Sequence, residues 1–203
     1  MERRSQKLHR TKSQTNRTNQ NTSRNRIKSR QKTNKNRFNN PHQGGQRTPK
    51  LILDSNILTK LVVNEPESKD ARTTITSLLR KDYILYTVDI ALAESLNAIW
   101  KHANIHKDLT QEEANTAIND LTKIYDALHI ISTRELTQKT TEIALTQNIT
   151  IYDSLYLAAT QKLNATLYTA DQKLHNIAIK IKLNTQQTIK KATQHGITES
   201  LSN

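Results

Sequence analysis

The chain has 203 residues, no cysteine and a formal net charge of +13 at pH 7, so little length remains after one domain of usual size. The lack of cysteine excludes disulfide scaffolds and cysteine-ligated zinc or iron–sulfur sites. The longest apolar run covers residues 155–159, whereas a membrane helix needs about 20 such residues, and no signal-peptide core follows Met1. We therefore expect a soluble, cytoplasmic protein.

The basic excess lies in the first quarter of the chain. Residues 1–50 hold 15 Lys and Arg against one acid, Glu2, whereas residues 51–203 hold 16 Lys and Arg against 17 acids. The first segment has too few apolar residues to offset the entropy of ordering its backbone, so we expect a disordered basic tail over residues 1–49. Such a tail is an arm that grips RNA in a salt-dependent way, a solubilising extension, or the product of a misplaced start codon.

Alternating strand and helix patterns begin at Leu51. Four short apolar runs predict strands buried on both faces, at residues 51–53, 83–88, 130–131 and 165–169. Apolar residues at helical spacing lie between them, at residues 66–81, 92–99, 118–128 and 150–163. This alternation predicts an α/β fold whose central parallel sheet is covered by helices on both faces.

The glycine content excludes two classes of α/β protein, and changes in polarity along the chain mark its domain boundaries. Gly196 is the only glycine after residue 50, which excludes the phosphate-cradling loops of Rossmann and P-loop proteins. We divide the chain into the tail at residues 1–49, a folded domain at 50–183 and a polar C-terminal extension at 184–203. A final helix is expected at residues 186–193.

Acidic residues lie where a parallel sheet places its working site. Such sites lie beyond the carboxyl ends of the strands, where Asp54 follows the first run and Asp171 the fourth. Asp153 opens a predicted helix, and Glu94 lies in the helix after the second run. If the first and fourth strands are neighbours, these carboxylates converge into an oxygen-only cluster suited to Mg²⁺ or Mn²⁺, ions that serve phosphodiester hydrolysis.

Each acid also has a purely structural interpretation. Asp54 and Asp171 are typical helix N-caps, Thr150 with Asp153 resembles a capping box, and an exposed Glu94 would be an ordinary solvated side chain. The structural interpretation is the stronger one for each acid taken singly. Their joint placement is the argument for a metal site.

Other residues carry weaker signals. His102 and His106 are four apart on a predicted helix, and they are either a metal pair or, as we prefer, surface histidines, because no Glu lies between them. Trp100 is expected to make core or dimer contacts. Asp89 is expected to cap the helix that carries Glu94.

Four segments together resemble the PIN-domain ribonucleases, and within them the VapC toxins of type II toxin–antitoxin pairs. They are LILDSNILTKL at residues 51–61, VDIALAESLNAIW at 88–100, TIYDSLYLAA at 150–159 and LYTADQKL at 167–174. They occur in the family's order, and the resemblance spans roughly residues 50–180. The chain departs from the pattern at Gln172 and Lys173, where many relatives carry a further acid, and in its basic tail.

The resemblance implies a three-layer α/β/α PIN-like fold and a Mg²⁺- or Mn²⁺-dependent endoribonuclease that prefers single-stranded RNA. It also implies a homodimer and, for the toxins, a small antitoxin partner. The family's metal-binding acids and supporting polar residues fall on Asp54, Glu94, Asp153, Asp171, Thr169, Ser55 and Asn56. Two alternatives stay open: an RNA-processing nuclease of ribosome or tRNA maturation, and a non-catalytic RNA-binding scaffold.

Overall fold

A computed structural model describes residues 48–188, so the predicted basic tail lies outside the described residues except for its last two positions. Five parallel strands form one sheet in the order β3-β2-β1-β4-β5. The strands are β1 (Lys50–Leu53), β2 (Ile84–Val88), β3 (His129–Ile131), β4 (Thr166–Thr169) and β5 (Asn184–Gln187). The first four fall on the predicted apolar runs, and the first and fourth are neighbours, as the site hypothesis requires.

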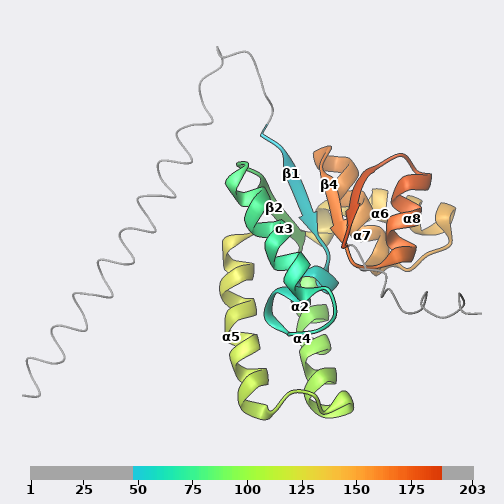
Figure 1. Cartoon of the computed structure of the whole chain (residues 1–203). Coiled ribbons are helices and arrows are strands. Elements are labelled where there is room, and N and C mark those ends of the chain that lie inside the picture. Colours follow the sequence, from blue (N-terminus) through green and yellow to red (C-terminus); the bar gives the residue numbers. More distant parts are fainter. Residues whose placement is uncertain (1–47, 189–203) are drawn as a thin grey trace, which may run out of the picture. The chain divides into compact units, whose positions relative to one another are not determined.

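Helices cover both faces of the sheet (Figure 1). They are α2 (Ser55–Val62), α3 (Ser68–Arg80), α4 (Ala91–Lys101), α5 (Gln111–Ala127), α6 (Thr133–Gln147), α7 (Ile151–Leu163) and α8 (Gln172–Lys180), with a π-helix, η1 (His102–His106), after α4. Because crossovers between parallel strands are right-handed, the strand order places α2–α5 on one face and α6–α8 on the other. The predicted three-layer α/β/α fold is confirmed.

The core lies between the central strands and α7. The three apolar residues of β1 are fully buried, and residues 154–160 of α7 are all buried where this helix lies against β1, β2 and β4. Each large apolar side chain buried in this way contributes about 1.5–3 kcal/mol. Within residues 48–188, no helix combines the length and apolarity needed to cross a membrane.

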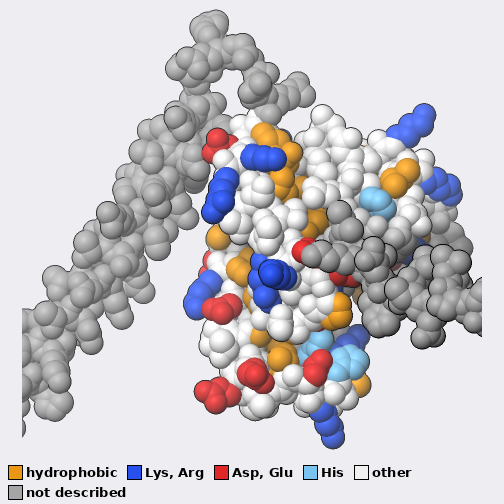
Figure 2. Space-filling view, in the orientation of Figure 1, with side chains coloured by type: hydrophobic (Ala, Val, Ile, Leu, Met, Phe, Trp, Pro, Cys, Tyr) orange, Lys and Arg blue, Asp and Glu red, His pale blue; other side chains and the backbone are white. Residues whose placement is uncertain are grey.

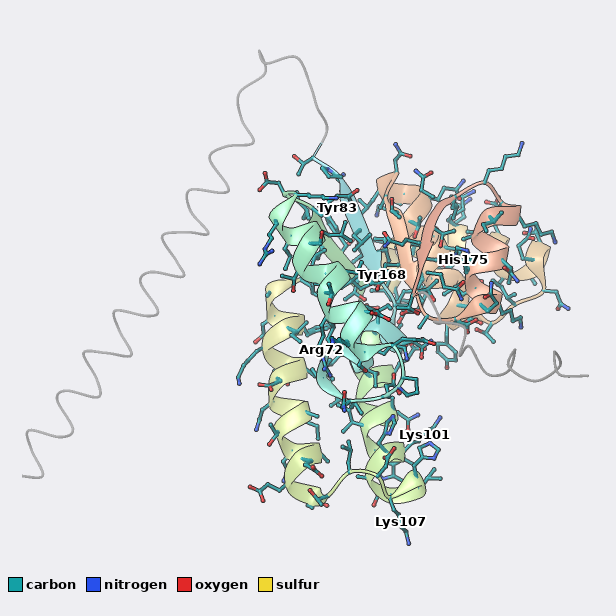
Figure 3. All side chains as sticks on the ribbon, viewed as in Figure 1. Arg72, Tyr83, Lys101, Lys107, Tyr168 and His175 are labelled. Atoms are coloured by element: carbon teal, nitrogen blue, oxygen red, sulfur yellow. The ribbon has the colours of Figure 1, made fainter. Side chains whose placement is uncertain are left out.

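Helix α2, which begins directly after β1, is held firmly at its far end. Arg72 of α3 donates from Nε to the Leu61 carbonyl at 3.1 Å and from Nη2 to the Val63 carbonyl at 2.9 Å (Figure 3). The buried Lys60 pairs with Glu65 at 3.0 Å. The two Arg72 bonds satisfy backbone carbonyls at the C-terminal end of α2, where such groups have no partner within the helix. They fix the helix that begins directly after the first predicted acid, Asp54.

The helix expected at residues 186–193 is wrong within the described residues. Gln186 and Gln187 belong to β5 rather than to a helix, while residues 189–193 of that predicted helix lie outside the described part of the chain. Strand β5 pairs with β4 at the sheet edge through backbone groups, so its polar side chains leave no apolar run in the sequence. Of the two roles expected for Trp100, a core contact is excluded because the side chain is 53% exposed, and a dimer contact stays a prediction.

Candidate active site

The predicted acids of the first and fourth strands meet where the chain reverses its direction across the sheet. After β1 the chain continues into α2 on one face, and after β4 it continues into α8 on the other. Crevices of ligand-binding α/β proteins form at such a switch point. The Asp54 backbone N–H donates to the Tyr168 carbonyl at 3.3 Å, which places Asp54 beside the end of β4.

Asp54 is both a helix cap and a buried acid. Its Oδ1 accepts from the Ile57 backbone N–H at 2.8 Å, which caps α2, and its Oδ2 accepts from the Thr169 hydroxyl. The residue is 1% exposed. Burial raises the pKa of this carboxyl to about 7, the two hydrogen bonds act against the rise, and the charges of Asp171 and Glu94 add to it.

Thr169 links Asp54 to the acid that follows β4. While its hydroxyl donates to Asp54, its oxygen accepts from the Asp171 backbone N–H at 2.9 Å. Asp171 in turn caps α8, because its Oδ1 accepts from the backbone N–H groups of Lys173 at 2.7 Å and Leu174 at 3.0 Å. The capping role predicted for both aspartates is confirmed, and it coexists with their convergence.

Glu94 approaches the same point from the first turn of α4. It is half-buried, and its Oε2 accepts a hydrogen bond from the hydroxyl of Tyr156, a residue of α7. The Ser95 hydroxyl donates to the Ser55 carbonyl at 3.2 Å, which holds α4 against the start of α2. Glu94 is therefore not the freely solvated side chain of the structural interpretation.

Asp153 lies in the first turn of α7, the helix that also carries Tyr156. Its backbone N–H donates to the Thr150 hydroxyl at 3.1 Å, as the predicted cap requires, and its half-buried side chain lies one turn before Tyr156. Within residues 48–188 its carboxylate makes no hydrogen bond or ion pair, so the contacts bring together Asp54, Glu94 and Asp171 rather than all four acids.

The polar residues after the first acid differ in placement. Ser55 is half-buried and its hydroxyl lies near that of Tyr156, whereas Asn56 is exposed. Tyr156 itself was not predicted as a site residue. Its sequence signal was its position three residues after Asp153, which puts both on one face of α7.

The donor chemistry suits a hard cation, although a closed ligand shell is not formed. Within the described residues, no three His, Asp or Glu side chains lie in the close arrangement of a metal site. The converging groups are all oxygen donors, as Mg²⁺ and Mn²⁺ prefer. The buried Asp54, next to two like charges, is a group that a cation would stabilise. The residues therefore fit such an ion in type and charge.

Two other predicted roles can be compared with the structure. His102 contacts Glu65 through Nε2 at 3.3 Å and Asp108 through Nδ1 at 3.0 Å, while His106 is exposed. Asp89 was expected to cap α4, and this is wrong: it accepts from the Thr133 backbone N–H at 2.9 Å and from the Thr133 hydroxyl. His102 and Asp89 thus serve contacts between loops and helices.

The family follows from a match to residues 51–180. The sequence model described as the PIN domain matches this range, which is most of the chain, and the protein belongs to the PIN domain family. Among characterised relatives, Ribonuclease VapC3 of Pyrobaculum aerophilum is 30% identical over 86 residues, which cover 42% of this chain and 62% of that protein. The match thus spans less than two thirds of the relative's length.

Two solved structures illustrate the matches to this chain. FitAB bound to the IR36 DNA fragment matches with a TM-score of 0.53 and 17% identity, over 72% of this chain and 99% of that one. VapBC2 of Rickettsia felis, bound to a DNA fragment from its promoter, matches with a TM-score of 0.48 and 20% identity, over 68% and 98% of the two chains. At 17% identity the likeness to FitAB concerns the fold alone.

Proposed function

We propose that the protein is a divalent-metal-dependent endoribonuclease that hydrolyses RNA phosphodiester bonds, with VapC-like toxin activity as the favoured biological role. The observation that carries the proposal is the buried Asp54, bridged by Thr169 to Asp171 and close to Glu94 at the switch point of the sheet. Membership of the PIN family and the partial similarity to Ribonuclease VapC3 support it.

Asp54, Glu94, Asp153 and Asp171 are the residues proposed to hold Mg²⁺ or Mn²⁺. When bound, the ion supplies Lewis-acid chemistry that activates water and stabilises the leaving oxygen. The chain itself holds two of the ligands in place, because the Thr169 hydroxyl donates to Asp54 while its oxygen accepts from the backbone of Asp171. The raised pKa of Asp54 means that this carboxyl keeps its proton more readily than an ordinary aspartate and releases it when a cation binds.

The direct test is RNA cleavage by wild type and Asp54→Asn, with Mn²⁺ or with EDTA. We expect wild type to cleave only with the metal and Asp54→Asn to be inactive although folded. Asp120→Asn is the matched control, because Asp120 is an exposed residue paired with Lys123 on α5. Full activity of Asp54→Asn would remove the assignment, and RNA binding without cleavage under any divalent ion would favour the scaffold alternative.

A small antitoxin and a second copy of the chain are the proposed protein partners. Exposed apolar side chains at the end of α4 and in η1, Trp100 and Ile105, offer contact area for such a partner. Growth arrest on expression that a neighbouring small reading frame relieves would support the toxin role. Size-exclusion chromatography with light scattering would show whether the chain dimerises.

RNA processing is the second candidate, and the basic tail favours it. The 15 Lys and Arg of residues 1–50 contrast with the near-neutral remainder, on which basic and acidic side chains intermingle over the face shown in Figure 2. A polycationic segment adds salt-dependent affinity for long RNA, and such a segment is not part of the VapC pattern that the chain resembles. Expression without growth arrest, together with altered rRNA or tRNA precursors in a deletion strain, would favour this role.

A further inference from the structure

The hydroxyl of Tyr156 lies at the centre of the candidate site without being one of its predicted ligands. It donates to Glu94 Oε2, and it lies near the Ser55 hydroxyl and the Asp54 carboxylate. The residue is 3% exposed, so its ring belongs to the core while its polar end reaches the acids.

This hydrogen bond joins elements from opposite faces of the sheet. Tyr156 lies on α7, which packs against β1, β2 and β4, whereas Glu94 lies on α4, which packs against α2 and α5. The two residues are 62 positions apart in the chain. The bond therefore fixes the distance between α4 and α7 at the edge where Asp54 and Asp171 meet.

The hydroxyl contributes orientation rather than packing. A phenylalanine would fill the same space in the core, but it would leave the half-buried Glu94 free to turn toward water. The bond uses Oε2 only, and within residues 48–188 Oε1 accepts no hydrogen bond. A tyrosine at this point thus selects one rotamer of a carboxylate and leaves one of its oxygens available.

We propose that Tyr156 is a positioning residue that holds Glu94 ready to bind the cation together with Asp54. The inference rests on the proposed metal-dependent function. Because Asp153 lies one turn earlier on α7, the same helix orients Asp153 and Glu94 together. Removing a group that orients a metal ligand in this way typically weakens metal affinity about 10–100-fold.

The test compares Mn²⁺ binding by wild type, Tyr156→Phe and Tyr152→Phe, using titration calorimetry on the full chain. Tyr156→Phe should bind Mn²⁺ about 10–100-fold more weakly while keeping its urea-unfolding midpoint in EDTA. Tyr152 is a matched control, because it lies on the same helix but is exposed, and its phenylalanine variant should bind as wild type does. Equal affinity of wild type and Tyr156→Phe would overturn the inference.

Testing Tyr156→Phe a second time, in the Glu94→Asp variant, distinguishes loss of the Glu94 orientation from a general loss of core packing. Glu94→Asp keeps the charge but withdraws the carboxylate from the hydroxyl, so adding Tyr156→Phe should cause little further loss of Mn²⁺ affinity. An equal loss of Mn²⁺ affinity when Tyr156→Phe is added to wild type and to Glu94→Asp would show that Tyr156 does not act through Glu94. If Tyr156→Phe does not fold, NMR offers a second test of the hydrogen bond. The hydroxyl proton of Tyr156 should give a downfield signal in metal-free wild type and none in Glu94→Ala. Persistence of that signal in Glu94→Ala would refute the bond.

Cleavage kinetics supply a further readout. At limiting Mn²⁺, Tyr156→Phe should lower kcat and leave KM for RNA unchanged, and excess Mn²⁺ should restore the rate. A rate that excess metal does not restore would contradict the proposed role. Wild type that neither binds Mn²⁺ nor cleaves RNA would remove the proposed function and this inference together, whereas an active wild type with an unaffected Tyr156→Phe would remove this inference alone.

Discussion

Metal-free protein should lose stability as the pH rises through the range in which Asp54 titrates. The ordinary pKa of 3.8 rises to about 7 in the fold because the carboxyl is buried. The folded state therefore holds this proton more tightly than the unfolded state does. The resulting stability is fully present below the unfolded pKa and is lost as the pH rises through the folded one.

The shift sets the size of the effect. Three pKa units correspond to about 4 kcal/mol at about 1.4 kcal/mol each, a large part of the roughly 5–15 kcal/mol that stabilises a typical domain. Asp89 acts in the opposite direction: partial burial alone would raise its pKa, but hydrogen bonds, those from Thr133 foremost, together outweigh this and lower the pKa. The measured quantity must therefore be a difference between two proteins.

Urea unfolding of wild type and Asp54→Asn in EDTA, from about pH 4 to about pH 8, isolates this difference. Asp54→Asn changes the contacts to Ile57 and Thr169 at every pH, which gives a constant offset. Relative to the variant, wild type should lose up to about 4 kcal/mol across this range. Mn²⁺ should restore wild type at neutral pH and leave the variant unchanged. Stability curves that stay parallel in EDTA would refute the reasoning from burial.

Three further outcomes are expected. Thr169→Val removes the hydroxyl that bridges Asp54 and Asp171. It should weaken Mn²⁺ binding at least about 10-fold and lower the free energy of unfolding in urea by about 1–3 kcal/mol. An unchanged Mn²⁺ affinity by calorimetry would contradict the bridging role. Deleting residues 1–49 should weaken RNA binding and flatten its salt dependence in fluorescence anisotropy, and an equal salt slope would show that the tail does not touch RNA. Trp100→Ala should change stability by less than about 0.5 kcal/mol because the side chain is exposed, yet reduce dimer or antitoxin binding; a fully retained complex would exclude Trp100 from the interface.

The sequence predicted those parts of the fold that burial marks directly. Strands β1 and β2 lie inside the sheet, so their residues form continuous apolar runs that are visible without a structure. Strand β5 pairs through its backbone at the edge, and nothing in its four polar residues distinguishes it from a loop or helix. Edge strands of this kind become recognisable only when the neighbouring strand is known.

The sequence predicted the contacts of site residues best where these residues directly follow strands, because the strand order then fixes their positions. Asp54 and Asp171 follow strands, so topology alone brings them together. Asp89 and Tyr156 instead make contacts with residues 44 and 62 positions away. Tyr156 lies in the longest apolar run of the chain, where an aromatic residue is expected to be an ordinary core residue. Only the hydrogen bond from its hydroxyl to Glu94 distinguishes it from the other core residues of this run.

For Asp171 and Glu94 the structural contact is compatible with the proposed metal binding, because each uses only one carboxylate oxygen in that contact, whereas both oxygens of Asp54 accept hydrogen bonds. Asp171 caps α8 through Oδ1, and Glu94 receives Tyr156 through Oε2. Within residues 48–188 the second oxygen of each accepts no hydrogen bond. An asparagine at Asp171 can keep the capping carbonyl while it loses the charge, so Asp171→Asn should keep α8 and lose Mn²⁺ affinity. Asp171→Ala should lose both, and only this pair of variants separates the helix cap from the proposed ligand.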